Sequence, residues 1–528
     1  MIIWGIYFYH SKTNLVPDYG GEYIEGIIGQ PLHINPILAY SNDTDADLSQ
    51  IIYSSLLKYD GENKLINDLA ESWEISEDKT TYTVKIRSDI LWHDGERLTV
   101  DDVTFTLNLI NNPAYKSSLR GNWQGVEINK IDDYTISFKT QEPYIGFVYN
   151  LTFGILPKHI WEAIPADKFH LTDLNLEPIG SGPYQYLSFQ KDADGNILSY
   201  KLITNQNYYQ GKPYISKITF NFYGDEEDAI EAYNNKEIMG LGGITLSKTG
   251  LIKLPQSTNI SKLTAPRYFA VFLNQNKSIP LANDEVREAL SLATNREEII
   301  NQVLFGNGQP IYSPILPGMI GYDENLGKID FNLEKANQLL DEKGWKKGED
   351  GVRAKDETVL EFNLITTEWE ELVATAEIIK SQWEQVGARV NLNILSISDM
   401  QQNYIRPREY DALLFGQVLG ADPDLYSFWH SDQKKDPGLN LALFGDQETD
   451  KLIEEGRVEF NPEKRTEKYK EFQEKIAQEI PAVFLYTPNY IYITNKKIRG
   501  IDIKNITMPS KRFSQIENWY ISTDRVWK

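Results

Sequence analysis

The sequence predicts a mixed α/β protein of several domains, and three observations support this prediction. The chain has 528 residues, enough for roughly three to four domains of about 150 residues each. Its content of 41% hydrophobic and 12% aromatic residues is typical of a folded chain. Alternating apolar and polar residues indicate half-buried strands in the first half, and helices alternate with strands from about residue 266 onward.

In the first half, Tyr82, Val84 and Ile86 alternate with polar residues, which predicts a strand. Thr99 with Asp102 three residues later forms a capping box and predicts the start of a helix. Asp194-Gly195 has the sequence of a hairpin turn. Further strands are expected over residues 23–28, 134–138, 198–204 and 218–223.

In the second half, helices are expected to begin at Asp284, Asn295 and Asn332 and at the pair Asn461-Pro462. Gly387 is expected to end a helix over residues 372–386, and a strand follows over 390–394. Residues 482–487 and 490–494 read as two strands that Pro488 separates.

The charge balance and the lack of cysteine exclude several functions. Lys and Arg total 53 against 76 Asp and Glu, which gives a net charge of −23. Such a chain is not expected to bind nucleic acid or to dock broadly on anionic lipid, since both need clustered positive charge. The absence of cysteine removes disulfides, thiolate metal sites and a lipid-modified N-terminal cysteine.

The N-terminal residues 1–20 are interpreted as an apolar remnant followed by a polar spacer. Met1–His10 is apolar but spans only about half of the ~20 residues that a membrane helix needs. It fits the tail of an anchor or signal whose upstream part is missing, and the alternative is a frayed apolar terminus.

The sequence shows no recognisable catalytic or cofactor motif. None of the six histidines has a histidine partner four residues away, so no HExxH zinc motif exists. Gly180–Tyr184 is glycine-rich but lacks the Lys-Ser/Thr end of a phosphate loop. We therefore predict no catalytic residue, no metal site and no cofactor.

An acidic loop is the most interesting polar feature. Residues 410–416 read as a buried strand, and Gly420–Asp424 follow it with two carboxylates. The carboxyl end of a strand is where α/β domains place ligand-binding groups. The alternative is an Asx-type turn, in which Asp422 caps its own backbone.

A set of spaced motifs resembles one protein family. The motifs, in chain order, are Leu69–Glu74, Tyr82–Arg87, Trp92–Glu96, Thr99–Val103, Leu156–His159, Gly180–Tyr184, Asn207–Pro213, Val286–Leu290 with Asn295-Arg296, Gly420–Asp424, Trp429–Ser431 and Phe484–Tyr486. Together they resemble the family 5 extracellular solute-binding proteins, the peptide-binding receptors of ABC importers, from about residue 20 to the C-terminus. Two departures are the missing acylated cysteine of the lipoprotein members and the stretch Asn235–Ile238.

The resemblance implies a two-lobed, periplasmic-binding-protein-like fold of type II, in the large peptide-binding class, with the ligand cleft between the lobes. Lobe 1 is expected over residues 21–266 plus 488–528, and lobe 2 over 267–487. The crossings are expected near Pro266–Val271 and Leu485–Pro488.

The resemblance also implies the ligand-binding residues. Asp422 is expected to pair with the α-ammonium of a peptide, and backbone groups of Gln417, Val418, Leu419 and Gly420 are expected to bond its main chain. Tyr40, Asn42 and Trp123 lie in loops that reach the cleft in family members, although an aromatic residue is more often part of the core.

The implied function is capture of peptides and their delivery to ABC permease subunits in the membrane, by a monomer located outside the cytoplasm and possibly tethered through its N-terminal segment. Within the same receptor class, an oligosaccharide, a metal chelate or haem is the alternative ligand. A carbohydrate-active enzyme and a peptide-holding sensor partner or chaperone are more remote alternatives.

Overall fold

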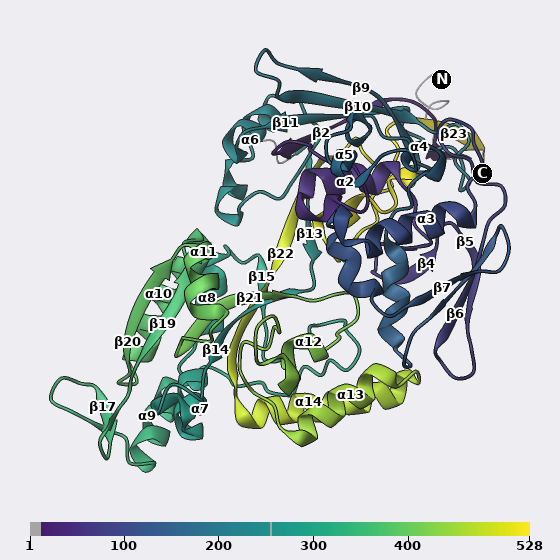
Figure 1. Ribbon diagram of the computed structural model, residues 1–528. Coiled ribbons are helices and arrows are strands. Elements are labelled where there is room, and N and C mark those ends of the chain that lie inside the picture. The colour runs from purple at the N-terminus through teal and green to yellow at the C-terminus, as the bar shows by residue number, and fades with distance from the viewer. Residues whose placement is uncertain (1–11, 254–255, 528) are drawn as a thin grey trace. The chain divides into compact units, whose positions relative to one another are not determined.

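The computed structural model describes residues 12–253 and 256–527, so the expected remnant Met1–His10 lies outside the described residues. The chain divides into two compact units, which are Met1–Thr264 with Tyr490–Lys528 (unit 1) and Ala265–Asn489 (unit 2). The lobe boundaries expected from the sequence, after residues 266 and 487, each lie two residues from these divisions. The α/β class is confirmed, because both units combine sheets with helices (Figure 1).

Unit 1 holds most of the strands. Its strands are β1 (Thr13–Pro17), β2 (Glu22–Ile28), β3 (Leu57–Tyr59), β4 (Leu65–Asn67), β5 (Ala70–Ile75), β6 (Thr81–Ile86), β7 (Glu127–Lys130), β8 (Thr135–Lys139), β9 (Tyr184–Lys191), β10 (Ile197–Thr204), β11 (Lys217–Tyr223), β12 (Gly240–Gly242), β13 (Thr258–Thr264) and β23 (Thr523–Trp527). Its helices are α2 (Asp43–Ile52), α3 (Val100–Asn111), α4 (Lys158–Trp161), α5 (Ala166–Phe169) and α6 (Glu226–Asn234).

The main sheet of unit 1 has the order β12-β2-β11-β10-β9, and a separate four-stranded sheet has the order β5-β6-β8-β7. The strands β9 and β10 form the hairpin expected around Asp194-Gly195, and Gly195 has a φ of 91°. The capping box expected at Thr99 and Asp102 opens α3. Local sequence signals therefore predict these elements correctly.

A buried charge cluster fixes the C-terminal segment within unit 1. Arg512 lies in the short 3-10 helix η10 (Pro509–Phe513) and donates to both oxygens of Asp47 at 2.6 Å and to Glu25 at 3.2 Å. All three side chains are at most 5% exposed. Burial raises the pKa of Glu25 above its ordinary range, in spite of the opposing effect of the Arg512 charge. The cluster joins η10 to β2 and α2.

Unit 2 alternates strands and helices as expected. Its strands are β14 (Arg267–Leu273), β15 (Gly308–Pro310), β16 (Lys346–Lys347), β17 (Arg353–Lys355), β18 (Thr358–Val359), β19 (Glu361–Thr367), β20 (Arg389–Leu395) and β21 (Ala412–Val418). Its helices are α7 (Asp284–Leu292), α8 (Arg296–Val303), α9 (Leu333–Glu342), α10 (Glu370–Glu384), α11 (Ile397–Asp399), α12 (Tyr426–Trp429), α13 (Gln447–Val458) and α14 (Pro462–Glu479). Its sheet runs β20-β19-β21-β14-β22.

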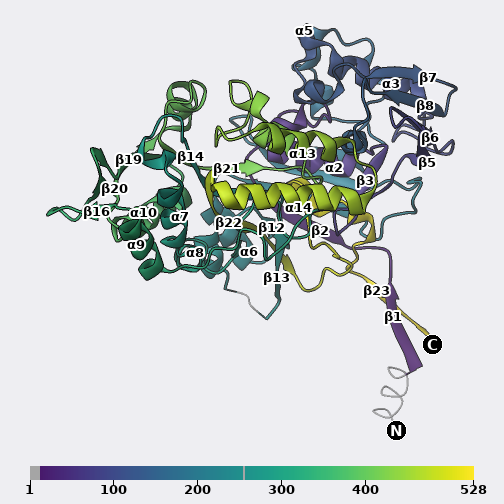
Figure 2. The ribbon, with the colours of Figure 1, turned by 90° about the horizontal axis from the view of Figure 1, so that it is seen from below.

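The core of unit 2 packs this sheet against helices. Tyr268, Trp429, Phe472 and Phe484 belong to one buried cluster. The helices α13 and α14 contact each other and lie side by side in both ribbon views (Figures 1 and 2). Asn461 caps α14 and Pro462 occupies its first turn, as the sequence predicts.

The expectation of two strands separated by Pro488 is wrong. The single strand β22 (Ala482–Asn495) continues through Pro488. Its first part pairs with β14 in unit 2, Pro488 lies opposite Gly308 of β15, and its last part pairs with β12 in unit 1. Proline is tolerated here because its fixed φ suits an extended chain and because β22 changes its pairing partner near this residue.

The segment expected as a spacer also differs. Thr13–Pro17 forms β1, which pairs antiparallel with β23 in a two-stranded ribbon (Figure 2). The partner strand lies about 500 residues away in sequence, and short exposed strands carry little local pattern. The pairing is therefore invisible to a local reading of the sequence.

The glycine-rich motif serves close packing in unit 1. A Cβ added to Gly180 would lie 2.0 Å from the carbonyl oxygen of Ile52, and one added to Gly182 would lie 2.5 Å from that of Ile51. His93 bridges the same segment, because its Nδ1 accepts from the Gly180 amide and its Nε2 donates to the Gly182 carbonyl, both at 3.1 Å. This arrangement requires the neutral imidazole, and burial lowers the pKa of His93 to about 4.

The buried, neutral His93 predicts that the free energy of unfolding decreases in acid. The folded-state pKa of His93 lies below its ordinary value of 6.5, so the unfolded chain takes up the proton first as the pH falls. The stabilisation is fully present above pH 6.5 and is lost as the pH falls toward 4, by about 3 kcal/mol for a shift of this size. Urea denaturation of the wild type and of His93→Gln across this range measures the difference. Equal pH slopes for the two proteins would contradict the assignment.

Candidate functional site

The candidate site in unit 2 lies at the carboxyl end of β21. The strand continues through Gln417 and Val418, two residues beyond the end expected from the sequence. The buried Gln417 side chain donates to the Leu439 carbonyl at 3.2 Å and accepts from the Tyr268 hydroxyl. In contrast, Val418 is 66% exposed. The strand end therefore combines an internally fixed glutamine with an exposed neighbour.

Asp422 has a protein partner that the sequence analysis did not predict. Its two carboxylate oxygens each accept a hydrogen bond from Arg465 of α14 at 2.5 Å. The side chains are 8% and 3% exposed, respectively. Arg465 also donates to the Gly456 carbonyl and the Tyr469 hydroxyl at 2.9 Å. This is a bidentate pair, the strong geometry for a guanidinium and a carboxylate.

The second carboxylate of the loop is also paired. Asp424 lies 3.2 Å from Arg457 of α13, whose guanidinium stacks over the Tyr426 ring at 4.5 Å. A local turn is present, but its capping side chain is Asp424 and not Asp422: the Asp424 carboxylate accepts from the Tyr426 amide, and the Asp424 amide donates to the Asp422 carbonyl. The loop is thus held in place by two arginines from neighbouring helices.

One edge of β21 carries backbone groups that point away from β14. At one end of the ladder between β14 and β21, the Leu419 amide donates to the Pro266 carbonyl, and at the other end the Asn274 amide donates to the Asp411 carbonyl. In an antiparallel ladder the bonded pairs alternate with unbonded ones, so the backbone groups of Gly416 and Val418 face the opposite edge. There β19 pairs only with Ala412 and Leu413, and no strand of the described residues pairs with the edge beyond them.

Gly416 also has a steric role at this edge. A Cβ added to it would lie 2.7 Å from the ring of Phe269, its cross-strand neighbour. The glycine leaves room for that ring and keeps the backbone accessible from the open edge.

In unit 1, Tyr40 and Asn42 are near neighbours in the chain, and Trp123 is part of the buried core. Tyr40 belongs to the 3-10 helix η1 (Ala39–Ser41), and burial raises its pKa to about 12. Asn42 caps α2, because its side chain accepts from the Thr44 amide at 3.0 Å. Trp123 is 2% exposed. Its indole packs against the rings of Phe138, Phe147 and Phe153.

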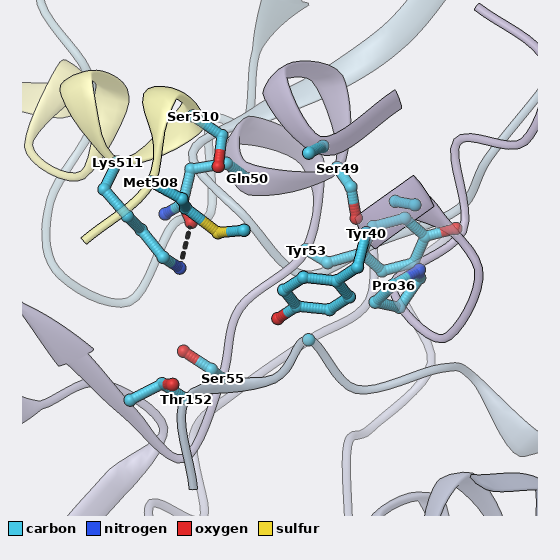
Figure 3. A pocket seen from close by; sticks show the side chains of 13 residues that line it. Pro36, Tyr40, Ser49, Gln50, Tyr53, Ser55, Thr152, Met508, Ser510 and Lys511 are labelled. Carbon is cyan, nitrogen blue, oxygen red and sulfur yellow. Dashed lines mark hydrogen bonds between the residues drawn. The ribbon is translucent and has the colours of Figure 1, made fainter. Parts of the chain in front are cut away.

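Tyr40 lines a hollow within unit 1 that has a cavity volume of about 30 Å³ (Figure 3). The hollow lies among η1, α2 and η10, and Ser49, Gln50, Ser510 and Lys511 also line it. The Lys511 ammonium donates to Gln50 Oε1 at 2.6 Å, the hydrogen bond drawn in Figure 3. The sequence analysis missed this lysine because a lysine in a basic pair such as Lys511-Arg512 is ordinarily exposed.

Arg465 and Lys511 are among the polar residues near the candidate sites that the sequence did not reveal. Arg465 is 43 residues from Asp422 in the chain, and only the fold brings the two together. Within the part of the chain that the structure describes, no group of three or more potential ligand side chains could hold a metal ion. Among the same residues, no helix has the length and apolar character needed to cross a bilayer.

Comparisons with known proteins cover nearly the whole chain. The chain is 29% identical over 522 residues to the oligopeptide-binding protein AppA of Bacillus subtilis, covering 97% of this chain and 94% of that protein. The structure of AppA with a nonapeptide aligns with a TM-score of 0.72 over 96% of this chain and all of that one.

Two further relatives are similar. The dipeptide-binding protein of Escherichia coli is 26% identical over 499 residues, which is 89% of this chain and 90% of that protein. The structure of NikZ from Campylobacter jejuni with Ni(L-His) is 25% identical and aligns with a TM-score of 0.74, covering 94% of this chain and 99% of that one.

The family model of the bacterial extracellular solute-binding proteins, family 5, matches residues 64–437. That match spans well over half of the chain and includes most of the motifs of both units. This protein therefore belongs to the bacterial extracellular solute-binding proteins of family 5.

Proposed function

We propose that this protein binds peptides outside the cytoplasm and delivers them to permease subunits of an ABC importer, without chemical turnover. The observation that carries the proposal is the open edge of β21 at Gly416 and Val418. An extended peptide can add to such an edge as a further strand, through main-chain hydrogen bonds that do not depend on side-chain identity. The similarity to oligopeptide- and dipeptide-binding proteins supports the same ligand class.

The proposal places the amino end of the peptide at Asp422. A carboxylate has about four lone-pair positions, and Arg465 occupies two of them. The remaining positions can accept an ammonium, and the Arg465 guanidinium holds the carboxylate in a fixed orientation. Because the pair with Arg465 is already neutral, the ammonium gains less Coulomb energy than it would beside an unpaired carboxylate.

Ligand capture would couple to a hinge motion at the two chain crossings, after Thr264 and after Asn489. Hinges in such proteins are a few residues that absorb the change in backbone angles. We expect a smaller radius of gyration by small-angle X-ray scattering when a bound peptide is present than when it is absent. An identical value in both states would argue against closure.

A metal chelate is the second candidate ligand, because the relative NikZ was crystallised with Ni(L-His). An oligosaccharide remains the third. Native mass spectrometry of the purified protein, followed by denaturation and identification of the released molecule, separates the three. Release of peptides supports the proposal, whereas release of a metal complex or a glycan would overturn it.

The role of Asp422 predicts a specific effect of N-acetylation. In the wild type, acetylating the amino end of a bound peptide should weaken binding by about tenfold or more, since losing a hydrogen bond to a charged group costs about 1.5–3 kcal/mol. In Asp422→Asn the same acetylation should change affinity by less than about threefold.

Asp424→Asn is the matched control, because it removes an equal charge two residues away. It should keep the acetylation penalty of the wild type. Calorimetry measures all three proteins with both peptides. If Asp422→Asn also keeps the full penalty, Asp422 does not contact the ammonium.

The ion pair itself predicts a large effect on stability. Asp422→Ala leaves Arg465 buried without its carboxylate, which should lower the free energy of unfolding by about 3–5 kcal/mol. The double variant Asp422→Leu with Arg465→Met removes both charges and should recover most of this loss. Urea denaturation at pH 7 provides the measurement. A loss below about 1 kcal/mol for Asp422→Ala would show that the pair is not essential to the fold.

A further inference from the structure

The hollow in unit 1 has the size of a small polar group. Its volume of about 30 Å³ exceeds the 10–15 Å³ that one water needs and is far below the several hundred Å³ of a pocket for a whole small molecule. A group of three heavy atoms, such as a carboxylate, matches it. The residues Tyr40, Ser49 and Ser510 bring hydroxyl groups to its wall.

Lys511 differs from the other buried cations around it. Lys58 lies 2.8 Å from Glu517 and 3.8 Å from Asp68, and Arg512 contacts both Asp47 and Glu25. Lys511 is only 8% exposed, and no carboxylate of the described residues lies within ion-pair distance of its ammonium. Gln50 accepts one of its hydrogen bonds, and the ring of Tyr59 lies 6.0 Å away.

A lysine in this state is incompletely satisfied. An ammonium carries three donors, and a buried charge is costly unless a carboxylate or several polar groups compensate it. Burial lowers the pKa of Lys511 to about 8, against the opposing effect of Asp68. The side chain is therefore still largely charged at pH 7, and it reaches into a hollow that has room for an acceptor (Figure 3).

We infer that the hollow beside Lys511 receives a carboxylate of the bound ligand, so that the protein prefers peptides with an anionic group at the corresponding position. The inference rests on the proposed peptide-binding function and deepens it. A carboxylate supplies the two oxygens that Lys511 and the hydroxyl groups of the wall can bond. In a chain of net charge −23, the overall field repels anions, so acceptance of an anionic group depends on a local cation such as this one.

A Lys511→Met variant tests the inference, because methionine keeps much of the side-chain volume while removing the charge. The matched control is Lys504→Met, an equal change of charge at a side chain that is 68% exposed and paired with Glu62. Calorimetry compares three versions of one peptide: with a glutamate side chain, with glutamine in its place, and with an amidated C-terminus.

The wild type and Lys504→Met should each bind the peptide that has the recognised carboxylate more tightly than the peptide that lacks it. The expected difference is about tenfold or more, the size of one charge-assisted hydrogen bond. Lys511→Met should lose this preference, to within about twofold. If the wild type binds the glutamine peptide more weakly than the glutamate peptide, the recognised group is a side-chain carboxylate. If it binds the amidated peptide more weakly, the recognised group is the C-terminal carboxylate. The inference would be overturned if the wild type showed no affinity difference between peptides with and without the carboxylate, wherever in the peptide the glutamate is placed. An equal difference in the wild type and in Lys511→Met would also overturn it.

A second measurement does not depend on peptides. Propionate and propionamide are titrated into the protein, and the NMR signal of the carbon next to the Lys511 ammonium is followed. Propionate alone should shift this signal and raise the lysine pKa, whereas propionamide should not. If peptides fail to bind but propionate acts in this way, the proposed function is wrong and the carboxylate site stands. If propionate has no effect and no peptide shows a carboxylate preference, the site is refuted.

Discussion

The burial of Arg512 between Asp47 and Glu25 is the constraint on which much of unit 1 depends. A buried guanidinium is costly unless polar or charged partners compensate it, and here two carboxylates from α2 and β2 face an arginine from a segment more than 460 residues later. The pairing returns the C-terminal segment to the first half of the chain. It also fixes η10, which carries Ser510 and Lys511 to the wall of the hollow. Arg512 and Lys58 each face two carboxylates, whereas the Lys511 ammonium has a single amide partner.

Unit 2 places its charges differently. Asp422 and Asp424 follow β21, and each is matched by an arginine from a neighbouring helix. The arginines hold the loop in one conformation and leave the open edge of β21 beside it. In the proposed function, the main-chain groups would recognise any extended ligand, and the oriented carboxylate would set the direction of its chain. The open edge follows from a strand that extends beyond its neighbour β19, and the orientation of the carboxylate follows from its pairing with Arg465.

Local signals predicted the elements, and contacts distant in sequence decided the sites. The capping box of Thr99 and the Asn461-Pro462 start were readable because each depends on residues within one helical turn. The continuity of β22 through Pro488 could not be predicted from the local sequence, since it depends on partners in β14, β15 and β12. The pairing of Asp422 with Arg465 and the burial of Lys511 were likewise hidden, because a sequence shows the presence of a charge but not what lies across from it. Trp123 was expected at the ligand site, but its indole packs among phenylalanine rings.

The strand β22 also limits how the sequence can vary in length. Its side chains alternate between two faces along 14 residues, and the alternation serves different partners before and after Asn489. Deleting or inserting one residue there would exchange the two buried faces for everything downstream, so that Tyr492 would lose its hydrogen bonds to Tyr23 and Glu25. Homologous chains should therefore tolerate insertions in many surface loops but keep a constant residue count across this crossing.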